Sequence, residues 1–536
     1  MSIGPRELHQ VLLPAFRDAI DAGAASVMSA YNEIDGIPCS ADPDLLSRIL
    51  REQWGFKGFV VSDLGAIPAL AQSQHVAADL TEAAALAINA GIDADLGGSG
   101  FERVVAAVKA GLAPQEKVDR AVARILRAKF DLGLFENPYC DPDEAERRVG
   151  AAQHRQLARQ IARESVVLLK NESGLLPLDP NLPSLAVIGP NADSVYNQLG
   201  DYTPPQPADK VVTVLQAIRA RVSPACMVRY AKGCAVRDSA TDGFAEALDA
   251  VRQSQAVVVV MGGSSARDFS TDYAATGAAR PALESRGNDM ESGEGFDRAT
   301  LDLPGVQLDL LRQVVAIGKP VVLVLIKGRP LALNWPAEHV PAILDAWYPG
   351  EQGGSAISDV LFGDYNPAGR LPISIPRSAG QLPVYYNAHP GARNDYADQS
   401  AAPLFAFGHG LSYTRFVYSN LRVAVEESAN TVKVWVSMDV KNTGPRAGDE
   451  VVQLYLHDLV SSVTLPLKSL KAFRRIPLQP GESRTVEFEL GPKDLALLNR
   501  DMRWVVEPGA FEVMAGSSSE NLPSKAQFEV KKYVRL

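Results

Sequence analysis

Long apolar runs, paired cysteines and basic clusters are all missing from this sequence. The longest apolar stretches, such as residues 256–261 and 320–326, fall far short of the ~20 residues that a membrane helix needs, so no membrane-spanning segment is expected. Lysine and arginine total 53 against 63 aspartates and glutamates, and they form no block of five or more. Because phosphate binding needs a concentrated positive surface, this charge pattern argues against nucleic acid as a partner.

Metal, redox and nucleotide motifs are absent as well. The cysteines, Cys39, Cys140, Cys226 and Cys234, show no Cys-x-x-Cys spacing, and the seven histidines form no His-x-x-x-His pair. No Walker loop and no Gly-x-Ser-x-Gly turn occurs. We therefore predict neither a metal site nor an organic cofactor. Cys226 and Cys234 are interpreted as buried thiols, with a disulfide in an oxidising compartment as the alternative.

Short apolar runs alternate with helical patterns in the first region, residues 1–150. The pattern predicts strands at residues 25–31, 58–63 and 92–96, and helices at residues 42–54, 79–91 and 101–110. Strands and helices in alternation are typical of a parallel sheet with crossover helices. A closed eight-stranded α/β barrel takes about 250 residues. The first region therefore predicts only the C-terminal part of a (β/α)8 barrel and a linker.

Two further regions follow, and they differ in sequence period. Residues 151–405 contain continuous apolar runs, which are typical of strands covered on both faces and predict a second α/β domain. The runs lie at residues 185–189, 256–261, 320–326 and 342–347, with a helix expected at 305–317. Residues 406–536 alternate apolar and polar positions, as in 432–440, and carry Pro-Gly turns. This period predicts a seven-stranded β-sandwich of immunoglobulin or fibronectin type.

Asp63 ends an apolar strand in the first region. Carboxylates at the carboxyl ends of barrel strands face the common active-site mouth, so this position suits a nucleophile or a base. The alternative is that Asp63 or the preceding Ser62 caps the helix that follows. Spacing alone does not choose between these two interpretations.

Glu294 lies between glycines in a loop of over forty residues, 262–304. Loops of this length are uncommon inside compact domains and are often functional, and glycines let the backbone approach a ligand closely. A solvated glutamate on a surface loop is the simpler interpretation. Glu284 and Glu291 are rival acids in the same loop.

A series of motifs runs along the whole chain in one order. They are Ser-Val-Met-Ser-Ala-Tyr-Asn (26–32), Gly-Phe-Val-Val-Ser-Asp (58–63), Ser-Val-Val-Leu-Leu-Lys-Asn (165–171), Glu-Ser-Gly-Glu-Gly-Phe-Asp-Arg (291–298), Leu-Asp-Leu-Pro-Gly-Val-Gln (301–307), Trp-Tyr-Pro-Gly-Glu-Gln-Gly-Gly (347–354), Pro-Ala-Gly-Arg-Leu-Pro (367–372) and Phe-Gly-His-Gly-Leu-Ser-Tyr (407–413). In this order the sequence resembles glycoside hydrolase family 3, the retaining β-glucosidases and β-xylosidases. The resemblance is to the C-terminal two-thirds or so of the family, and it implies the C-terminal part of a (β/α)8 barrel with a linker (1–150), an α/β sandwich domain (151–405) and a C-terminal fibronectin type III-like domain (406–536).

The resemblance also implies roles for individual residues. Asp63 matches the catalytic nucleophile, and Glu294 matches the acid/base, in preference to Glu291 because it directly precedes Gly-Phe-Asp-Arg. Tyr31 and Met28 match residues that line the pocket of the non-reducing sugar. Retaining hydrolysis needs two carboxyl groups about 5–5.5 Å apart. The implied activity is exo-acting release of terminal β-D-glucosyl residues, with a carbohydrate substrate and no cofactor.

Several alternatives stay open. Many relatives carry tryptophan where this chain has Leu64, and the family's earlier barrel segments, which hold other sugar hydroxyls, have no match here. A β-xylosidase is the close rival, and a catalytically incompetent carbohydrate-binding or assembly fragment is the rival from another class. An open barrel exposes strand edges, which predicts either that a homo-oligomer or a second chain completes it or that the first region is poorly stable. The first residues lack the features of a secretory signal, and both cytoplasmic and periplasmic or secreted locations stay open.

Overall fold

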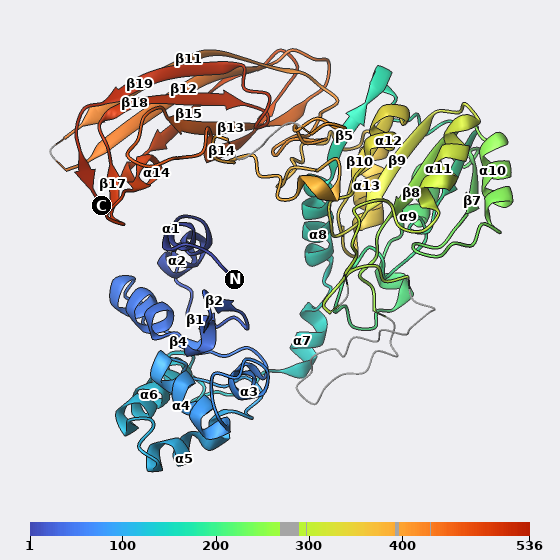
Figure 1. The fold of residues 1–536 in the computed structure, drawn as a ribbon. Coiled ribbons are helices and arrows are strands. Elements are labelled where there is room, and N and C mark those ends of the chain that lie inside the picture. The colour runs from blue at the N-terminus through green and yellow to red at the C-terminus, as the bar shows by residue number, and fades with distance from the viewer. Residues whose placement is uncertain (268–288, 296, 392–395, 429) are drawn as a thin grey trace. The chain divides into compact units, whose positions relative to one another are not determined.

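Three parallel backbone segments organise the first unit of the chain, residues 1–147 (Figure 1). Strand β4 (Phe59–Val61) pairs in parallel with β1 (Ser26–Met28) on one side, and on the other Val61 bridges in parallel to Ala94. The computed structural model describes residues 1–267, 289–295, 297–391, 396–428 and 430–536. The remaining elements of this unit are α1 (Pro5–Glu7), η1 (Leu8–Leu12), α2 (Pro14–Asp21), β2 (Glu33–Ile34), β3 (Ile37–Pro38), η2 (Cys39–Ala41), η3 (Asp44–Gln53), α3 (Ala66–Gln72), α4 (Leu80–Ala90), η4 (Phe101–Arg103), α5 (Val104–Lys109), α6 (Gln115–Asp131) and α7 (Pro142–Arg148).

Helix α4 forms where its end signals predict it. The Asp79 carboxylate accepts hydrogen bonds from the backbone N–H groups of Thr81 and Glu82, and Gly91, at φ +124°, ends the helix. The predicted strand at residues 92–96 is shorter than expected and consists of the bridge at Ala94. The chain turns away after it, because Gly97 and Gly98 both have positive φ.

The second unit begins at Arg148 and contains a six-stranded sheet. The strand order is β5-β10-β9-β8-β6-β7, and every neighbouring pair is parallel except β5 with β10. The strands are β5 (Val167–Asn171), β6 (Ser184–Ile188), β7 (Met227–Ala231), β8 (Ala256–Gly262), β9 (Val321–Ile326) and β10 (Ala342–Asp345). The four apolar runs of the sequence are therefore confirmed as strands, and β8 and β9 are buried along their whole length, as expected for central parallel strands.

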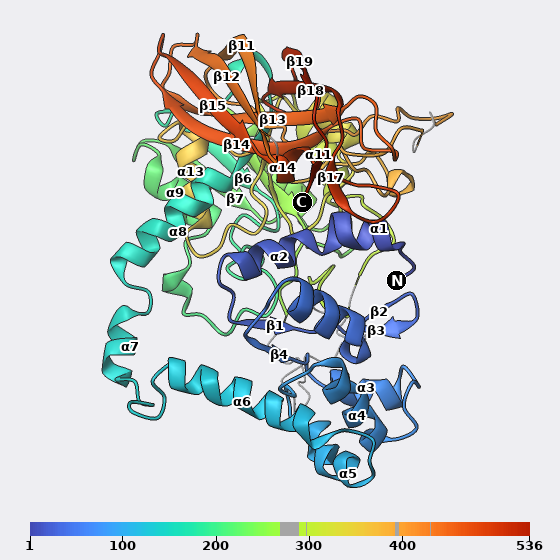
Figure 2. The same ribbon diagram turned by 90° about the vertical axis from the view of Figure 1, so that its left-hand side faces the viewer.

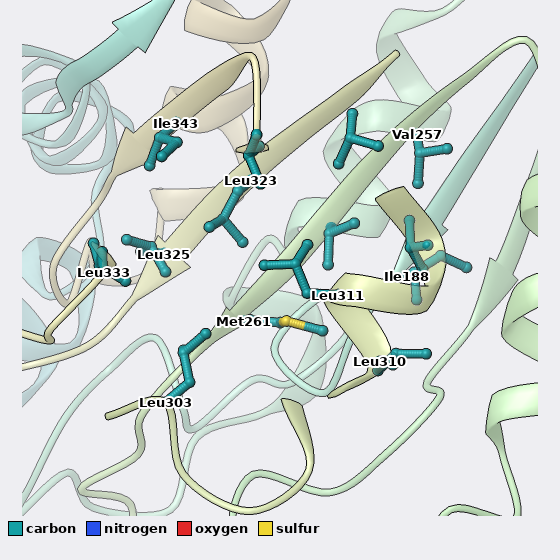
Figure 3. Close-up of a cluster of buried hydrophobic side chains, with 14 of the residues drawn as sticks. Ile188, Val257, Met261, Leu303, Leu310, Leu311, Leu323, Leu325, Leu333 and Ile343 are labelled. Carbon is teal, nitrogen blue, oxygen red and sulfur yellow. The ribbon is translucent and has the colours of Figure 1, made fainter. Parts of the chain in front are cut away.

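Helices cover both faces of this sheet. Helices α10 (Phe244–Arg252) and α11 (Gln307–Ala316) share one hydrophobic cluster with the sheet, which includes Met261 and Leu323 (Figure 3). Helices α9 (Val214–Arg221) and α13 (Gly353–Leu361) belong to the cluster on the other face. The remaining helical segments up to residue 405 are α8 (Ala152–Ser165), η5 (Glu172–Gly174), η6 (Ala208–Lys210), α12 (Asn334–His339) and η7 (Ala379–Gln381). This layering is the predicted α/β sandwich.

Two antiparallel sheets form the C-terminal β-sandwich (Figure 2). A three-stranded sheet, β11-β12-β15, and a four-stranded sheet, β14-β13-β18-β19, bury their facing side chains in one core. The elements are β11 (Phe416–Glu427), β12 (Val432–Asn442), β13 (Gly448–Asp458), β14 (Ser469–Leu478), β15 (Ser483–Leu490), α14 (Pro492–Leu495), β16 (Leu497–Leu498), β17 (Trp504–Val506), β18 (Gly509–Gly516), β19 (Ser524–Val530) and β20 (Val534–Arg535). The two-residue period is confirmed in β12, whose alternate residues are buried. No helix in the described part of the chain is long and apolar enough to cross a membrane.

Asp458, the last residue of β13, lowers the stability of the sandwich at neutral pH. Burial raises its pKa to about 6, and the charge of Glu507 adds to this shift, although a backbone hydrogen bond at Val460 opposes it. The folded state therefore binds a proton more tightly than the unfolded state, and stability falls as the pH rises from about 4 to about 6.

Replacement of Asp458 by Asn should therefore stabilise the protein at pH 7. Asparagine keeps the carbonyl acceptor for the backbone hydrogen bond and removes the buried charge. We expect about 1–3 kcal/mol at pH 7 and no gain at pH 4, where the native aspartate is protonated in the folded state. Urea unfolding of both proteins at the two pH values measures this, and an equal difference at both would contradict the assignment.

Candidate active site

Asp63 lies just beyond the carboxyl end of β4, the central parallel segment of the first unit. Its side chain is half-buried, and its Oδ1 accepts a hydrogen bond of 2.7 Å from the backbone N–H of Leu64. Helix α3 begins at Ala66, its N-cap is Gly65, and no side chain caps it. The capping alternative for Asp63 and for Ser62 therefore has no support, and the carboxylate is available for chemistry.

Ser62 connects the end of β4 to the neighbouring segment. Its buried hydroxyl donates to Asp95 Oδ1 at 3.2 Å and accepts from the backbone N–H of Leu96 at 3.0 Å. The other oxygen of Asp95 accepts from the N–H groups of Gly100 and Phe101, at 2.7 and 2.9 Å. These bonds fix the backbone from which the Asp63 side chain projects.

Tyr31 lies beside the Asp63 segment. Its hydroxyl donates a 2.7 Å hydrogen bond to the carbonyl of Leu64, and its own carbonyl accepts from Gln74 Nε2 at 2.7 Å. Met28 pairs with Val61 in the β1–β4 ladder, and Val61 is two residues before Asp63 in the chain. Tyr31 and Met28 are 47% and 53% exposed, so both offer apolar surface at the strand end that carries Asp63. The structure thus brings three of the predicted site residues together.

A buried ionic network contacts β4 at Val60. The Asp93 carboxylate accepts from Arg51 at 2.6 Å, from Arg124 at 2.7 Å and from the backbone N–H of Val60 at 2.8 Å. Burial lowers the pKa of Arg51, against the opposing charge of Asp93. A buried carboxylate with several donors is satisfied only in one geometry, so the network defines the position of β4.

The acid candidate lies at a different sheet, in the second unit. Strands β6 and β8 are neighbours in the sheet. After β6 the chain continues to β7 on one side, and after β8 it continues to β9 on the other side, so the two connections leave in opposite directions. In open α/β sheets, ligands bind at such a topological switch point, outside the carboxyl ends of the strands. Glu294 belongs to the loop after β8 and is exposed.

Among the described residues, Asp201, Arg267 and Tyr202 contact Glu294. Its backbone N–H donates to Asp201 Oδ2 at 3.1 Å, and its carbonyl accepts from Arg267 Nη2 at 3.0 Å. The Tyr202 hydroxyl donates to Glu294 Oε2. Although burial acts in the opposite direction, the hydrogen bond to Asp201 and the surrounding negative charge raise the pKa of Arg267. Glu294 is therefore an exposed carboxyl group on a fixed stretch of backbone.

Glu291, the rival acid, has a different environment. Its side chain is 2% exposed and forms a 2.7 Å ion pair with Arg298, and Oε1 accepts from Ser292 at 3.1 Å. The Glu291 carboxylate is therefore buried and paired, whereas Glu294 is exposed. Glu284, the other rival, lies outside the described residues.

Metal ligands and cysteines were the other candidate functional groups of the sequence. Within the described residues, no His, Cys, Asp and Glu side chains form a group of three that could hold a metal ion. All four cysteines are free thiols, so Cys226 and Cys234 form no disulfide. Asp63 belongs to the first unit and Glu294 to the second, so each carboxylate is described within its own unit.

The sequence matches three known domain families. The glycosyl hydrolase family 3 N-terminal domain matches residues 1–128, the family 3 C-terminal domain matches 166–413, and a fibronectin type III-like domain matches 450–519. The chain is 40% identical to a β-xylosidase from Formosa agariphila over 535 residues, which are 96% of this chain and 70% of that protein. The chain belongs to glycosyl hydrolase family 3. A periplasmic β-glucosidase from Salmonella typhimurium is 36% identical, with 99% of this chain and 71% of the relative covered.

Solved structures of β-glucosidases agree with this fold. A β-glucosidase from Erythrobacter marinus superposes with a TM-score of 0.88 at 40% identity and covers 98% of this chain and 71% of its own. A Listeria innocua β-glucosidase in complex with isofagomine gives 0.89 at 32% identity, with 100% and 72% covered. The predicted fold class, a partial barrel followed by an α/β sandwich and a fibronectin-like sandwich, is confirmed.

Sequence reasoning missed the contacts of Glu294. Arg267 follows the glycines that end β8, which is a position where functional side chains gather, but nothing singled it out from other arginines. Asp201 and Tyr202 come from the loop after β6, far away in the chain. Only the sheet order brings these two loops together.

Proposed function

We propose that this family 3 chain is a retaining, exo-acting β-glycosidase that releases terminal β-D-glucosyl residues from oligosaccharides or β-glucosides. The observation that carries the proposal is the half-buried Asp63 carboxylate, uncommitted to a helix cap, beyond the end of a barrel strand with Tyr31 and Met28 beside it. Carboxylates at this end of barrel strands are the usual catalytic groups of the fold. The carbohydrate substrate follows from the family.

In the proposed mechanism, Asp63 attacks the anomeric carbon while Glu294 gives its proton to the departing glycosidic oxygen. The bond to the leaving group breaks as the ester bond between Asp63 and the sugar forms. Glu294, now ionised, then takes a proton from water, which attacks the anomeric carbon; the bond between this carbon and Asp63 breaks, and the sugar leaves with its original configuration. Two carboxyl groups and water balance the reaction, so the proposal includes no metal or organic cofactor.

The exposure of the two carboxylates fits these different roles. A nucleophile must be ionised and held still, and Asp63 is fixed by the Leu64 N–H. An acid/base must meet the leaving group and then water, and exposed Glu294 meets this requirement better than buried Glu291 does. We further propose that the chain divides functionally into residues 1–150, 151–405 and 406–536.

Paired substrates test the proposal. The purified chain, at an oligomeric state determined by light scattering, should hydrolyse 4-nitrophenyl β-D-glucopyranoside at least about tenfold better in kcat/KM than the β-D-xylopyranoside, which lacks the hydroxymethyl group. The α-D-glucopyranoside is the matched control and should not react. Faster turnover of the xyloside would favour a β-xylosidase, the name carried by the Formosa agariphila relative. Absence of turnover with both β-glycosides would refute the proposed activity.

A further inference from the structure

One ion pair holds the Glu294 peptide at both of its polar groups. Asp201 and Arg267 contact each other at 2.6 Å and 3.1 Å, with side-chain exposures of 21% and 7%. Asp201 accepts the N–H of Glu294, and Arg267 donates to its carbonyl. Because this ion pair binds both the N–H and the carbonyl of Glu294, the backbone of Glu294 cannot rotate without breaking charge-assisted hydrogen bonds.

The residues beside Glu294 favour the same conformation. A Cβ atom on Gly293 would lie 2.3 Å from Met290 Cε and 2.9 Å from Asp201 Oδ2, so a larger residue would have to displace the end of the Met290 side chain and the Asp201 carboxylate. Gly295 has φ +72°, which favours glycine as well. The two flanking glycines therefore favour the backbone conformation that places the Cα atom of Glu294.

Tyr202 determines where the carboxyl group of Glu294 ends. Its hydroxyl donates to Glu294 Oε2, and its ring lies under the Arg267 guanidinium, with the central carbon 4.8 Å from the ring centre. Tyr202 itself has φ +55°, a left-handed conformation that is uncommon for tyrosine. An exposed glutamate without such a partner would sample several rotamers.

We propose that Asp201, Arg267 and Tyr202 are positioning residues for the acid/base: the ion pair fixes the backbone of Glu294, and the tyrosine fixes its carboxyl group. The inference rests on the proposed function of Glu294. A proton donor accelerates the reaction only when it lies within hydrogen-bond reach of the leaving oxygen, and small misplacements cost large factors in rate. The exposed loop thereby acquires the fixed geometry that acid catalysis needs.

Leaving-group dependence tests this role, because a misplaced acid slows only those substrates that need protonation. Tyr202→Phe and Arg267→Met should lower kcat/KM for a phenyl β-glucoside by about tenfold or more. For the 2,4-dinitrophenyl β-glucoside, whose leaving group departs without a proton, both variants should stay within about threefold of the parent chain. Arg329→Met is the matched control, since it removes an exposed ion pair with Asp297 on the same loop without touching Glu294, and it should change neither rate.

Two results would overturn the inference. Equal losses with both glucosides, or no loss with either, in Tyr202→Phe and Arg267→Met would show that these residues do not act through the acid. Thermal unfolding checks that both variants remain folded at the assay temperature. Glu294→Gln separates the two levels of the proposal. If Glu294→Gln leaves phenyl glucoside hydrolysis intact, the proposed acid role of Glu294 is wrong. If Glu294→Gln slows this hydrolysis, the results with Tyr202→Phe and Arg267→Met test the positioning role alone.

Discussion

Asp63→Asn is expected to lower kcat for 4-nitrophenyl β-D-glucopyranoside by at least about 10⁴-fold, because an amide cannot form the glycosyl ester on which the retaining pathway depends. Asparagine keeps an acceptor for the Leu64 N–H, so the turn at the end of β4 should survive. Asp119→Asn is the matched control: it neutralises an exposed carboxylate of helix α6, whose contact is to Gln115, and should leave the rate unchanged. Steady-state kinetics and a melting curve for each variant measure both effects.

Azide distinguishes loss of the nucleophile from general damage. In Asp63→Gly the side opposite the leaving group is vacated, and a small anion can attack the anomeric carbon from there. The expected product is the α-glucosyl azide, formed with inversion because the second displacement is missing. Undiminished hydrolysis by Asp63→Asn would remove Asp63 from the reaction, and a β-glucosyl azide from Asp63→Gly would assign it a different role.

The second large effect concerns Glu294. Glu294→Gln should lower kcat/KM for a phenyl β-glucoside by about 10²–10⁴-fold, the usual contribution of a positioned general acid. The 2,4-dinitrophenyl glucoside should lose far less in kcat/KM, since its first step needs no proton. Azide should rescue the second step in Glu294→Ala and give the β-glucosyl azide, because Asp63 still forms the ester and the anion attacks from the acid's side.

Glu291→Gln is the informative comparison for this prediction. Glu291 is buried against Arg298, so neutralising it leaves an unpaired buried charge, which costs about 3–5 kcal/mol. We expect a lower melting temperature, and any loss in kcat/KM relative to the parent chain should be the same for the phenyl and the 2,4-dinitrophenyl glucoside. If Glu291→Gln showed the leaving-group dependence and Glu294→Gln did not, the assignment of the acid would pass to Glu291.

Much of the fold could be predicted from local patterns. The buried strands β6, β8, β9 and β10 are short continuous apolar runs, and β12 alternates along its length, so run length identified the first four strands and the two-residue period identified β12. The strand expected at residues 92–96 was too long, because apolar character indicates burial and does not count ladder hydrogen bonds. Glycines with positive φ end that segment after a single bridge.

The candidate site could be predicted only in part. Asp63 stood out because it follows a strand, and Tyr31 and Met28 came from resemblance to a family. The residues around Glu294 could not be found in this way, since Asp201 and Arg267 are distant in the chain and meet only because β6 and β8 are neighbours in the sheet. The preference for Glu294 over Glu291 came from the motif that follows it, but the burial of Glu291 and the exposure of Glu294 could not be predicted from a glycine-rich loop.

The most direct test is to trap the covalent intermediate. A 2-deoxy-2-fluoro-β-glucosyl fluoride has a good leaving group and a destabilised second transition state, so a retaining enzyme should accumulate the glycosyl ester. After proteolysis, mass spectrometry should find one fluoroglucosyl adduct, on the peptide that carries Asp63 and at that residue, and none in Asp63→Asn. An adduct on a different carboxylate, or turnover of the reagent without any adduct, would contradict a double displacement through Asp63.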